Sequence, residues 1–268
     1  MPATSAITAT TRATTTAPMS PASHTPGFTV GPLSVSTATL ARHAELLRAS
    51  AERGQGGWVV TLNTEMLARM AHDPDYGDLL SQADLCVADG MPLVWASQRQ
   101  PDRARHIPER TTGVDLVDRL LRERRVPPFA IIGGRDPQAT LTHRYPHAQA
   151  ACRFCFTGRV DGSDAQIERF ARELERHEVR LLFLALGVPK QDVLAAALRA
   201  RLPQVVIIGV GGTFEILGPE GRRAPRWMQR SGLEWFYRFV REPGRLWRRY
   251  LLQYPAGIRY LLTHAAQS

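Results

Sequence analysis

The sequence predicts an α/β protein with a Rossmann-like, largely parallel sheet flanked by helices. Between residues 27 and 200, short apolar runs alternate with segments of helical spacing, which is typical of βαβ units. The apolar runs show no polar alternation, as expected of strands that helices cover on both faces. Several runs also end in glycine or polar residues, where open parallel sheets keep their ligand sites.

Length and composition agree with this class. The chain has 268 residues, of which 44% are hydrophobic, enough for one large or two small domains. No apolar run approaches the roughly 20 residues of a membrane-spanning helix, and the first residues hold no apolar signal-peptide core. Three cysteines do not suggest a disulfide framework. We therefore expect a cytoplasmic protein.

Composition divides the chain into three segments. Residues 1–26 are rich in Thr, Ala, Ser and Pro and contain no acid, which predicts a disordered tail, with a transit peptide as the alternative. Residues 27–220 form the predicted α/β domain. Residues 221–268 are basic and rich in aromatic side chains, and we expect a helical appendage there.

Each element of the α/β domain is predicted from its own pattern. Short apolar runs predict strands at 57–62, 83–88, 128–134, 179–187 and 204–212. Helical spacing of apolar residues predicts helices at 64–72, 114–124, 165–177 and 190–202, and a further helix is expected at 91–97. In the appendage, two helices separated by Pro243 and Gly244 are the simplest arrangement.

Polar residues at the predicted strand ends are the candidates for chemistry. Thr61 and Asn63 lie at the end of the first of these strands, Asp89 follows the second, Gln191 a later one and Glu215 the last. Glycines beside them would let backbone N–H groups approach an anion closely. The chain has no GxGxxG or Walker pattern in the right context, so nicotinamide or ATP use is not supported.

Each candidate also has a structural alternative, which the residues alone leave open. Asp89 could cap the helix at 91–97, and Thr61 and Asn63 could cap strand ends. Arg110, just before a predicted helix, could be a solvated surface arginine. Gln191 could be an ordinary residue in the first turn of a helix.

A metal site is not indicated. The CxxC pair Cys152 and Cys155 supplies two thiolates, whereas a structural zinc ion needs four ligands. This pair also lies in an apolar stretch that is typical of a strand. The eight histidines show neither HxxxH nor HExxH spacing.

The appendage concentrates positive charge. From Gly221 to Tyr260 only Glu234 and Glu242 oppose ten arginines: Arg222, Arg223, Arg226, Arg230, Arg238, Arg241, Arg245, Arg248, Arg249 and Arg259. A nucleic-acid surface, a membrane-surface segment and a solvated helix face would each explain this charge. Tryptophan and tyrosine beside leucine favour the lipid boundary, where an anionic leaflet attracts each basic residue by about 1 kcal/mol.

Several stretches together resemble one family. They include "TLNTEML" (61–67), "SQADLCVADGMPLVWAS" (81–97), "ERTTGVDL" (109–116), "LGVPKQD" (186–192) and "GVGGTFEILGPEGRRAPRWMQ" (209–229). Over residues 28–255 the chain resembles the bacterial WecG/TagA/CpsF glycosyltransferases. These enzymes add one sugar to a polyprenyl-pyrophosphate-linked sugar during the assembly of surface polysaccharides. The form "DGMPLVW" is most similar to members that build xanthan-like exopolysaccharides.

The resemblance implies roles for the candidates. Asp89 matches the proposed catalytic base, and Thr61, Asn63 and Arg110 match residues of its pocket. Gln191 matches the glutamine of a "PKQE" stretch, which reads "PKQD" here, and Glu215 stands where many members have Asp.

The family's carboxyl-terminal appendage is thought to close over the pocket at the membrane. Its arginines help to bind the pyrophosphate of the donor. The matching residues here are Arg238, Arg245 and Arg248.

The resemblance therefore implies an inverting glycosyltransferase with a UDP-sugar donor and a polyprenyl-pyrophosphate-linked acceptor. We expect no cofactor and no metal, because arginines can stabilise a leaving diphosphate. Glucose is the first expectation for the donor sugar, and N-acetylmannosamine or its uronic acid the second. The protein would bind the inner face of the inner membrane through anionic lipid, without a nucleic-acid partner, and a homo-oligomer stays open. A nucleic-acid-binding protein with a basic arm and a membrane scaffold without turnover are the rival classes.

Overall fold

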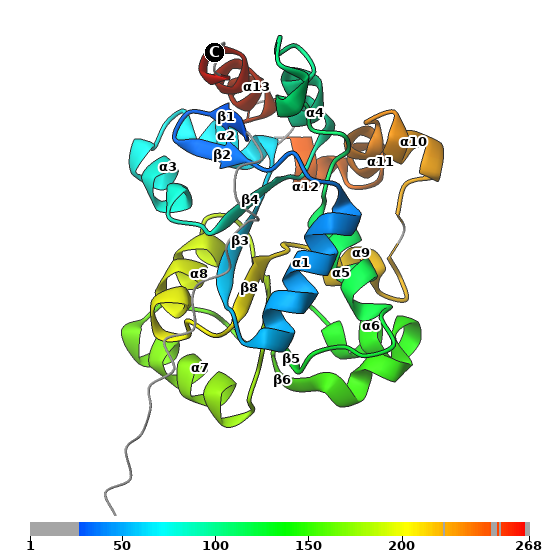
Figure 1. Cartoon of the computed structure of the whole chain (residues 1–268). Coiled ribbons are helices and arrows are strands. Elements are labelled where there is room, and N and C mark those ends of the chain that lie inside the picture. The colour runs from blue at the N-terminus through cyan, green and yellow to red at the C-terminus, as the bar shows by residue number, and fades with distance from the viewer. Residues whose placement is uncertain (1–26, 222, 248–250, 252, 266–268) are drawn as a thin grey trace, which may run out of the picture.

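A computed structural model describes residues 27–221, 223–247, 251 and 253–265 of the chain (Figure 1). The predicted disordered tail at 1–26 lies outside the described residues. No helix in the described part of the chain is long and apolar enough to span a bilayer.

The core of the fold is an eight-stranded sheet in the order β1-β2-β4-β3-β8-β7-β5-β6. The first two strands pair antiparallel and all other neighbours pair parallel, which confirms the predicted, largely parallel α/β sheet. The strands are β1 (Phe28–Val30), β2 (Leu33–Val35), β3 (Gly57–Leu62), β4 (Leu85–Ala88), β5 (Phe129–Gly133), β6 (Cys152–Phe156), β7 (Leu181–Ala185) and β8 (Val206–Gly209).

Helices pack on both faces of the sheet (Figure 1). One face carries α1 (Leu40–Arg53), α5 (Gly113–Leu121), α6 (Pro137–Arg144) and α9 (Thr213–Leu217). The opposite face carries α2 (Thr64–Met70), α3 (Pro74–Ser81), α4 (Met91–Ser97), α7 (Asp164–Arg176), α8 (Lys190–Arg201) and α13 (Tyr254–His264). The short helices α10 (Arg226–Arg230), α11 (Glu234–Arg241) and α12 (Pro243–Trp247) come from the appendage.

The sheet has one apolar layer on each face, which explains why the sequences of its strands are unbroken hydrophobic runs. In β7, Leu182 and Leu184 belong to the layer beneath α8, whereas Leu181 and Phe183 belong to the layer beneath α5. Successive side chains of a strand point to opposite faces, so a strand buried on both sides needs an apolar residue at every position.

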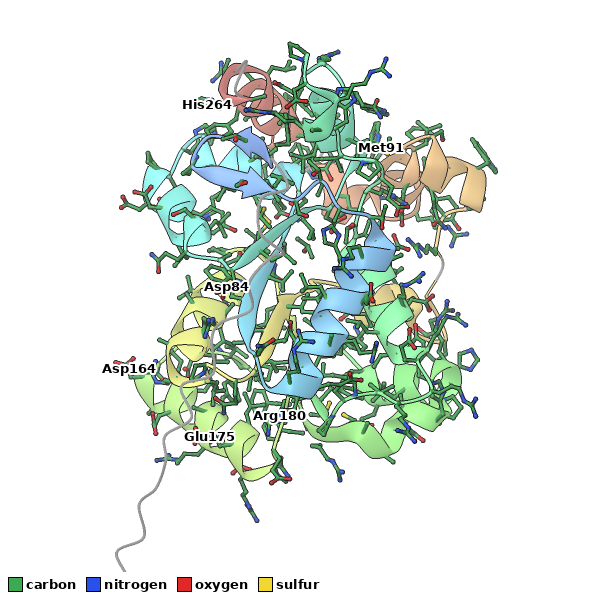
Figure 2. The ribbon with its side chains drawn as sticks, in the orientation of Figure 1. Asp84, Met91, Asp164, Glu175, Arg180 and His264 are labelled. Carbon is green, nitrogen blue, oxygen red and sulfur yellow. The ribbon has the colours of Figure 1, made fainter. Side chains whose placement is uncertain are left out.

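The order of the strands creates a crevice at one end of the sheet. Neighbouring strands β3 and β8 lead into α2 and α9, which pack on opposite faces. Such a divergence opens a crevice beyond the carboxyl ends of the strands. Figure 2 shows this polarity: Met91, just after β4, lies near the upper end of the molecule, and Arg180, just before β7, lies at the lower end.

The structure adds elements to the sequence prediction and shortens others. The hairpin of β1 and β2 and the helices α1, α3 and α6 had no counterpart in the expected elements. The runs expected at 83–88 and 204–212 both begin in loops, and the second also ends in one, so β4 and β8 have four residues each. In the appendage, Pro243 begins α12 rather than separating two helices, in agreement with the preference of proline for the first helical turn.

The last described helix returns to the first elements of the fold. Ala265 bridges Val30 of β1, and the Gly31 N–H donates to the His264 carbonyl at 3.1 Å. On α13, a Cβ atom at Gly257 would lie 2.2 Å from the carbonyl oxygen of Thr64 in α2. Only glycine therefore permits this close approach of the two helices.

Replacing Gly257 should loosen α13 from α2. We expect Gly257→Ala to lower the free energy of unfolding by about 1–3 kcal/mol, because the added methyl group must displace a backbone. Urea denaturation followed by circular dichroism measures this loss. The matched control is Gly244→Ala in α12, where a Cβ meets nothing within 4 Å. Equal stability of the two variants would contradict the proposed contact.

Candidate active site

A cleft of about 2030 Å³ lies at the carboxyl ends of β3, β4, β7 and β8. Small-molecule sites typically have roughly 300–1,000 Å³, so this cleft has room for two substrates together. Residues of α11 and α13 also line it, so the carboxyl-terminal segment forms part of its wall.

Asp89 lines this cleft directly after β4. Its backbone N–H continues the sheet by donating to the Leu62 carbonyl of β3 at 2.7 Å. The next residue, Gly90, has a φ of 155°, which side-chain-bearing residues rarely adopt. Gly90, not Asp89, is the N-cap of α4, and α4 receives no side-chain cap. The alternative that Asp89 caps the helix at 91–97 is therefore wrong.

The surroundings of the Asp89 carboxylate place its pKa near neutrality. Desolvation raises the pKa from 3.8 to about 6, and the charges of Glu234 and Asp115 act in the same direction. The Arg110 guanidinium and the N–H of Gly113, which donates to the carboxylate, hold the pKa down. A carboxylate in this range can accept a proton at neutral pH and remain a reasonable base.

Arg110 reaches Asp89 through an extension of the sheet. The Thr111 N–H donates to the Ala88 carbonyl at 2.7 Å, which brings the preceding arginine beside the residue that follows β4. The Arg110 side chain is only 15% exposed, and its Nη2 lies 2.8 Å from Oε2 of Glu234. The solvated-surface alternative for Arg110 is therefore wrong.

A second arginine joins this cluster from the appendage. Nη2 of Arg223 lies 2.6 Å from Oδ1 of Asp115 in α5, and its Nε lies 3.7 Å from Oε1 of Glu234. Glu234 thus lies between Arg110 and Arg223. We did not predict Arg223, Glu234 or Asp115 as site residues, because opposite charges distant in sequence carry no local signal of pairing.

Thr61 and Asn63 line the cleft, and both side chains also have structural roles. The Thr61 hydroxyl donates to the Gly209 carbonyl at 2.9 Å and so joins β3 to β8. Oδ1 of Asn63 accepts from the N–H groups of Glu65 and Met66, at 3.0 and 3.2 Å, and caps α2. Asn63 therefore is a cap, but of the helix that follows β3 and not of the strand end.

Gln191 and Glu215 brace the glycine-containing loops of the cleft. Gln191 lies in the first turn of α8, is buried, and accepts through Oε1 from the Gly211 N–H at 3.1 Å. Glu215 of α9 accepts from the Arg135 N–H, just after β5, at 2.8 Å. Both residues line the same cleft as Asp89.

The side chains of the three predicted appendage arginines lie outside the described part of the structure. Arg238 belongs to α11 and Arg245 to α12, but their side chains are outside the described part of the structure. Arg248 lies outside the described residues altogether. Two other arginines of the segment, Arg241 and Arg259, do line the cleft.

Large apolar side chains are exposed along the segment that borders the cleft. From α4 and α10 to α13 they are Trp95, Trp227, Leu233, Trp235, Phe236, Val240, Trp247, Leu251 and Leu262. Tryptophan at such a density on a surface marks a site of contact with a membrane or another protein.

The remaining metal candidates lie apart from the cleft. Cys152 and Cys155 belong to β6, the edge strand, as the predicted strand required, and both are free thiols. Within the residues that the structure describes, no three His, Cys, Asp or Glu side chains gather to hold a metal ion.

Comparison with known proteins agrees with this arrangement. Residues 28–268 match the family described as "Glycosyl transferase WecG/TagA/CpsF family". The chain belongs to this family of glycosyltransferases. One curated relative from Bacillus subtilis (strain 168) is an N-acetylglucosaminyldiphosphoundecaprenol N-acetyl-beta-D-mannosaminyltransferase. It is 30% identical over 205 residues, which cover 73% of this chain and 75% of the relative.

The burial of Asp89 predicts that it lowers the stability of the folded protein. Its folded pKa of about 6 exceeds the unfolded value, so stability falls as pH rises from about 4 to about 6. We expect Asp89→Asn to raise the free energy of unfolding at pH 8 by about 1–3 kcal/mol, with no gain at pH 4.

Urea denaturation at both pH values measures this difference. The control is Asp136→Asn, a residue of the same cleft that caps α6, because asparagine caps a helix equally well. A gain at pH 4 as large as that at pH 8 would show that ionisation is not the cause.

Proposed function

We propose that this glycosyltransferase moves a sugar from a UDP-sugar to a polyprenyl-pyrophosphate-linked monosaccharide, with Asp89 as the catalytic base. The observation that carries the proposal is the Asp89 carboxylate itself. It has a pKa near 6, lies beside Arg110, and lines a cleft large enough for both substrates.

The proposed step is an inverting displacement. The acceptor hydroxyl oxygen attacks the anomeric carbon of the donor, and the bond from that carbon to the β-phosphate oxygen of UDP breaks. The hydroxyl proton passes to Asp89, and UDP leaves with the bonding electrons. Negative charge therefore grows on the diphosphate while Asp89 loses its own.

Arginines are the groups of this cleft that can stabilise the leaving diphosphate. Arg110, Arg241 and Arg259 line the cleft, and we assign Arg238, Arg245 and Arg248 to the same task. Thr61, Asn63, Gln191 and Glu215 would contact the substrates where they line the wall. With guanidinium groups in this role, the reaction needs neither a divalent metal nor a cofactor.

Two donor sugars are candidates. The named activity of the Bacillus subtilis relative favours N-acetylmannosamine, transferred to an N-acetylglucosamine carried on the lipid. The "DGMPLVW" stretch, similar to that of xanthan-type members, instead favours glucose on a glucosyl lipid. The relative covers most of the chain and so supports N-acetylmannosamine more strongly.

The exposed tryptophans and the arginines of the appendage support docking on an anionic leaflet. Aromatic rings prefer the headgroup boundary, and basic residues are attracted to anionic lipid. The acceptor lipid lies in the same membrane, so docking would place the open cleft beside it. We therefore propose a peripheral enzyme on the inner face of the inner membrane.

A matrix of donors and acceptors tests the proposed reaction. Radiolabelled UDP-N-acetylmannosamine and UDP-glucose are each offered with N-acetylglucosaminyl- and glucosyl-pyrophosphoryl polyprenol. We expect label in the lipid phase from the first donor on the first acceptor, with unchanged yield in EDTA. Asp89→Asn should lower the turnover number at least about 100-fold. A scaffold would transfer no label from either donor.

Vesicle binding tests the proposed docking surface. We expect Arg241→Gln, in α11, to weaken binding to vesicles containing phosphatidylglycerol about fivefold, the equivalent of about 1 kcal/mol. The matched control is Arg172→Gln on α7, a helix of the opposite end of the molecule (Figure 1). Equal weakening by both variants would contradict the assignment, and retention on duplex DNA in place of vesicles would favour the nucleic-acid alternative.

A further inference from the structure

One carboxylate of the appendage reaches into the catalytic end of the cleft. Glu234, the first residue of α11, is only 14% exposed although α11 otherwise presents aromatic side chains to solvent. Its two oxygens face two different arginines, with Oε2 at 2.8 Å from Arg110 and Oε1 at 3.7 Å from Arg223. Two guanidinium groups on either side of an enclosed carboxylate hold that negative charge in one position.

The two arginines come from different parts of the chain. Arg110 precedes α5 and acts on the Asp89 carboxylate, whereas Arg223 lies in the loop after α9 and pairs with Asp115 of α5. Glu234 therefore connects the appendage to the α/β domain at the side of the cleft where Asp89 lies. Helix α11 cannot leave this position without separating Glu234 from Arg110.

We propose that Glu234 is a positioning residue, which orients Arg110 beside Asp89 and holds Arg223 in the same ion-pair cluster, and so couples proton transfer to the seating of the appendage. This inference rests on the proposed function, because Asp89 must act as the base. Glu234 itself does not touch the reacting atoms. It acts through Arg110, whose guanidinium it orients, and through its own negative charge.

The charges around Asp89 decide the direction of the effect. Arg110 before α5 opposes protonation of Asp89, and so does the Gly113 N–H at the start of α5. Asp115 of α5 and Glu234 of α11 favour protonation. Removing the charge of Glu234 deletes one like charge that acts on Asp89, and this lowers the pKa of Asp89.

Glu234→Gln tests the inference through two readouts that should move in different ways. We expect the turnover number at pH 8 to fall at least about 10-fold, because Arg110 and Arg223 lose their common anchor. At the same time the acid limb of the pH profile of kcat/KM should shift to lower pH by about 0.5–1 unit. A residue that only secured the fold would lower activity without moving the acid limb.

Two variants control this result. Glu220→Gln removes a carboxylate that lines the same cleft but is not among the charges acting on Asp89, so the acid limb should stay in place. Glu234→Asp keeps the charge but shortens the side chain. Glu234→Asp should lower the turnover number but leave the acid limb of the pH profile in place. It replaces Glu234→Gln as the test if that variant does not fold.

A readout without turnover separates this inference from the proposed reaction. The stability gain of Asp89→Asn over the wild type grows from about pH 4, where the unfolded chain ionises, and levels off at the pH where Asp89 ionises in the folded protein. In a Glu234→Gln background the gain should level off at a pH lower by the same about 0.5–1 unit and should be smaller at pH 8. An unchanged plateau pH and an unchanged acid limb would overturn the inference, even if sugar transfer is observed. Absence of transfer from every donor, with a shifted plateau pH, would instead overturn the proposed function.

Discussion

The partly desolvated carboxylate of Asp89 is the constraint on which the site depends. Burial alone would protonate it, and a nearby cation alone would make it too weak a base. The fold balances the two effects with Arg110 and the Gly113 N–H on one side and Glu234 and Asp115 on the other. Two backbone hydrogen bonds, Asp89 to Leu62 and Thr111 to Ala88, extend the sheet just far enough to bring the acid and the arginine together. The geometry of the chemistry is thus a continuation of the strand pairing.

The carboxyl-terminal segment completes this balance from outside the sheet. Glu234 brings a charge to the end of the cleft that holds Asp89, while α13 is fixed to β1 and α2. Helix α2 starts at the Asn63 cap, directly after the strand that carries Thr61. A displacement of α13 would therefore reach the floor of the cleft through α2, and a displacement of α11 would reach it through Arg110. The two contacts make one wall of the active site depend on the appendage.

The sequence was sufficient to predict the sheet, because each central strand is buried on both faces and so reads as an unbroken apolar run. It also placed Thr61, Asn63, Asp89, Gln191 and Glu215 at strand ends, and all five line the cleft. It did not predict β1 and β2, whose three residues are too short for a period to be recognised. Nor did it single out Glu234 or Arg223, since an ion pair across the fold has no spacing rule. The resemblance placed Arg110 in the pocket, whereas the residues alone favoured a solvated surface.

The cluster around Glu234 also bears on how a membrane could influence the reaction. Trp235 and Phe236 follow Glu234 directly, and they are 42% and 46% exposed on the same short helix. Trp235 and Phe236 lie within one helical turn of Glu234. A shift of these rings at a lipid headgroup boundary would therefore also shift Glu234. The carboxylate would transmit it to Arg110, and Arg110 to Asp89, over one ion pair and one charge contact. The proposed docking and the basicity of Asp89 would then be linked through one segment, because the exposed rings and Glu234 are adjacent in the chain.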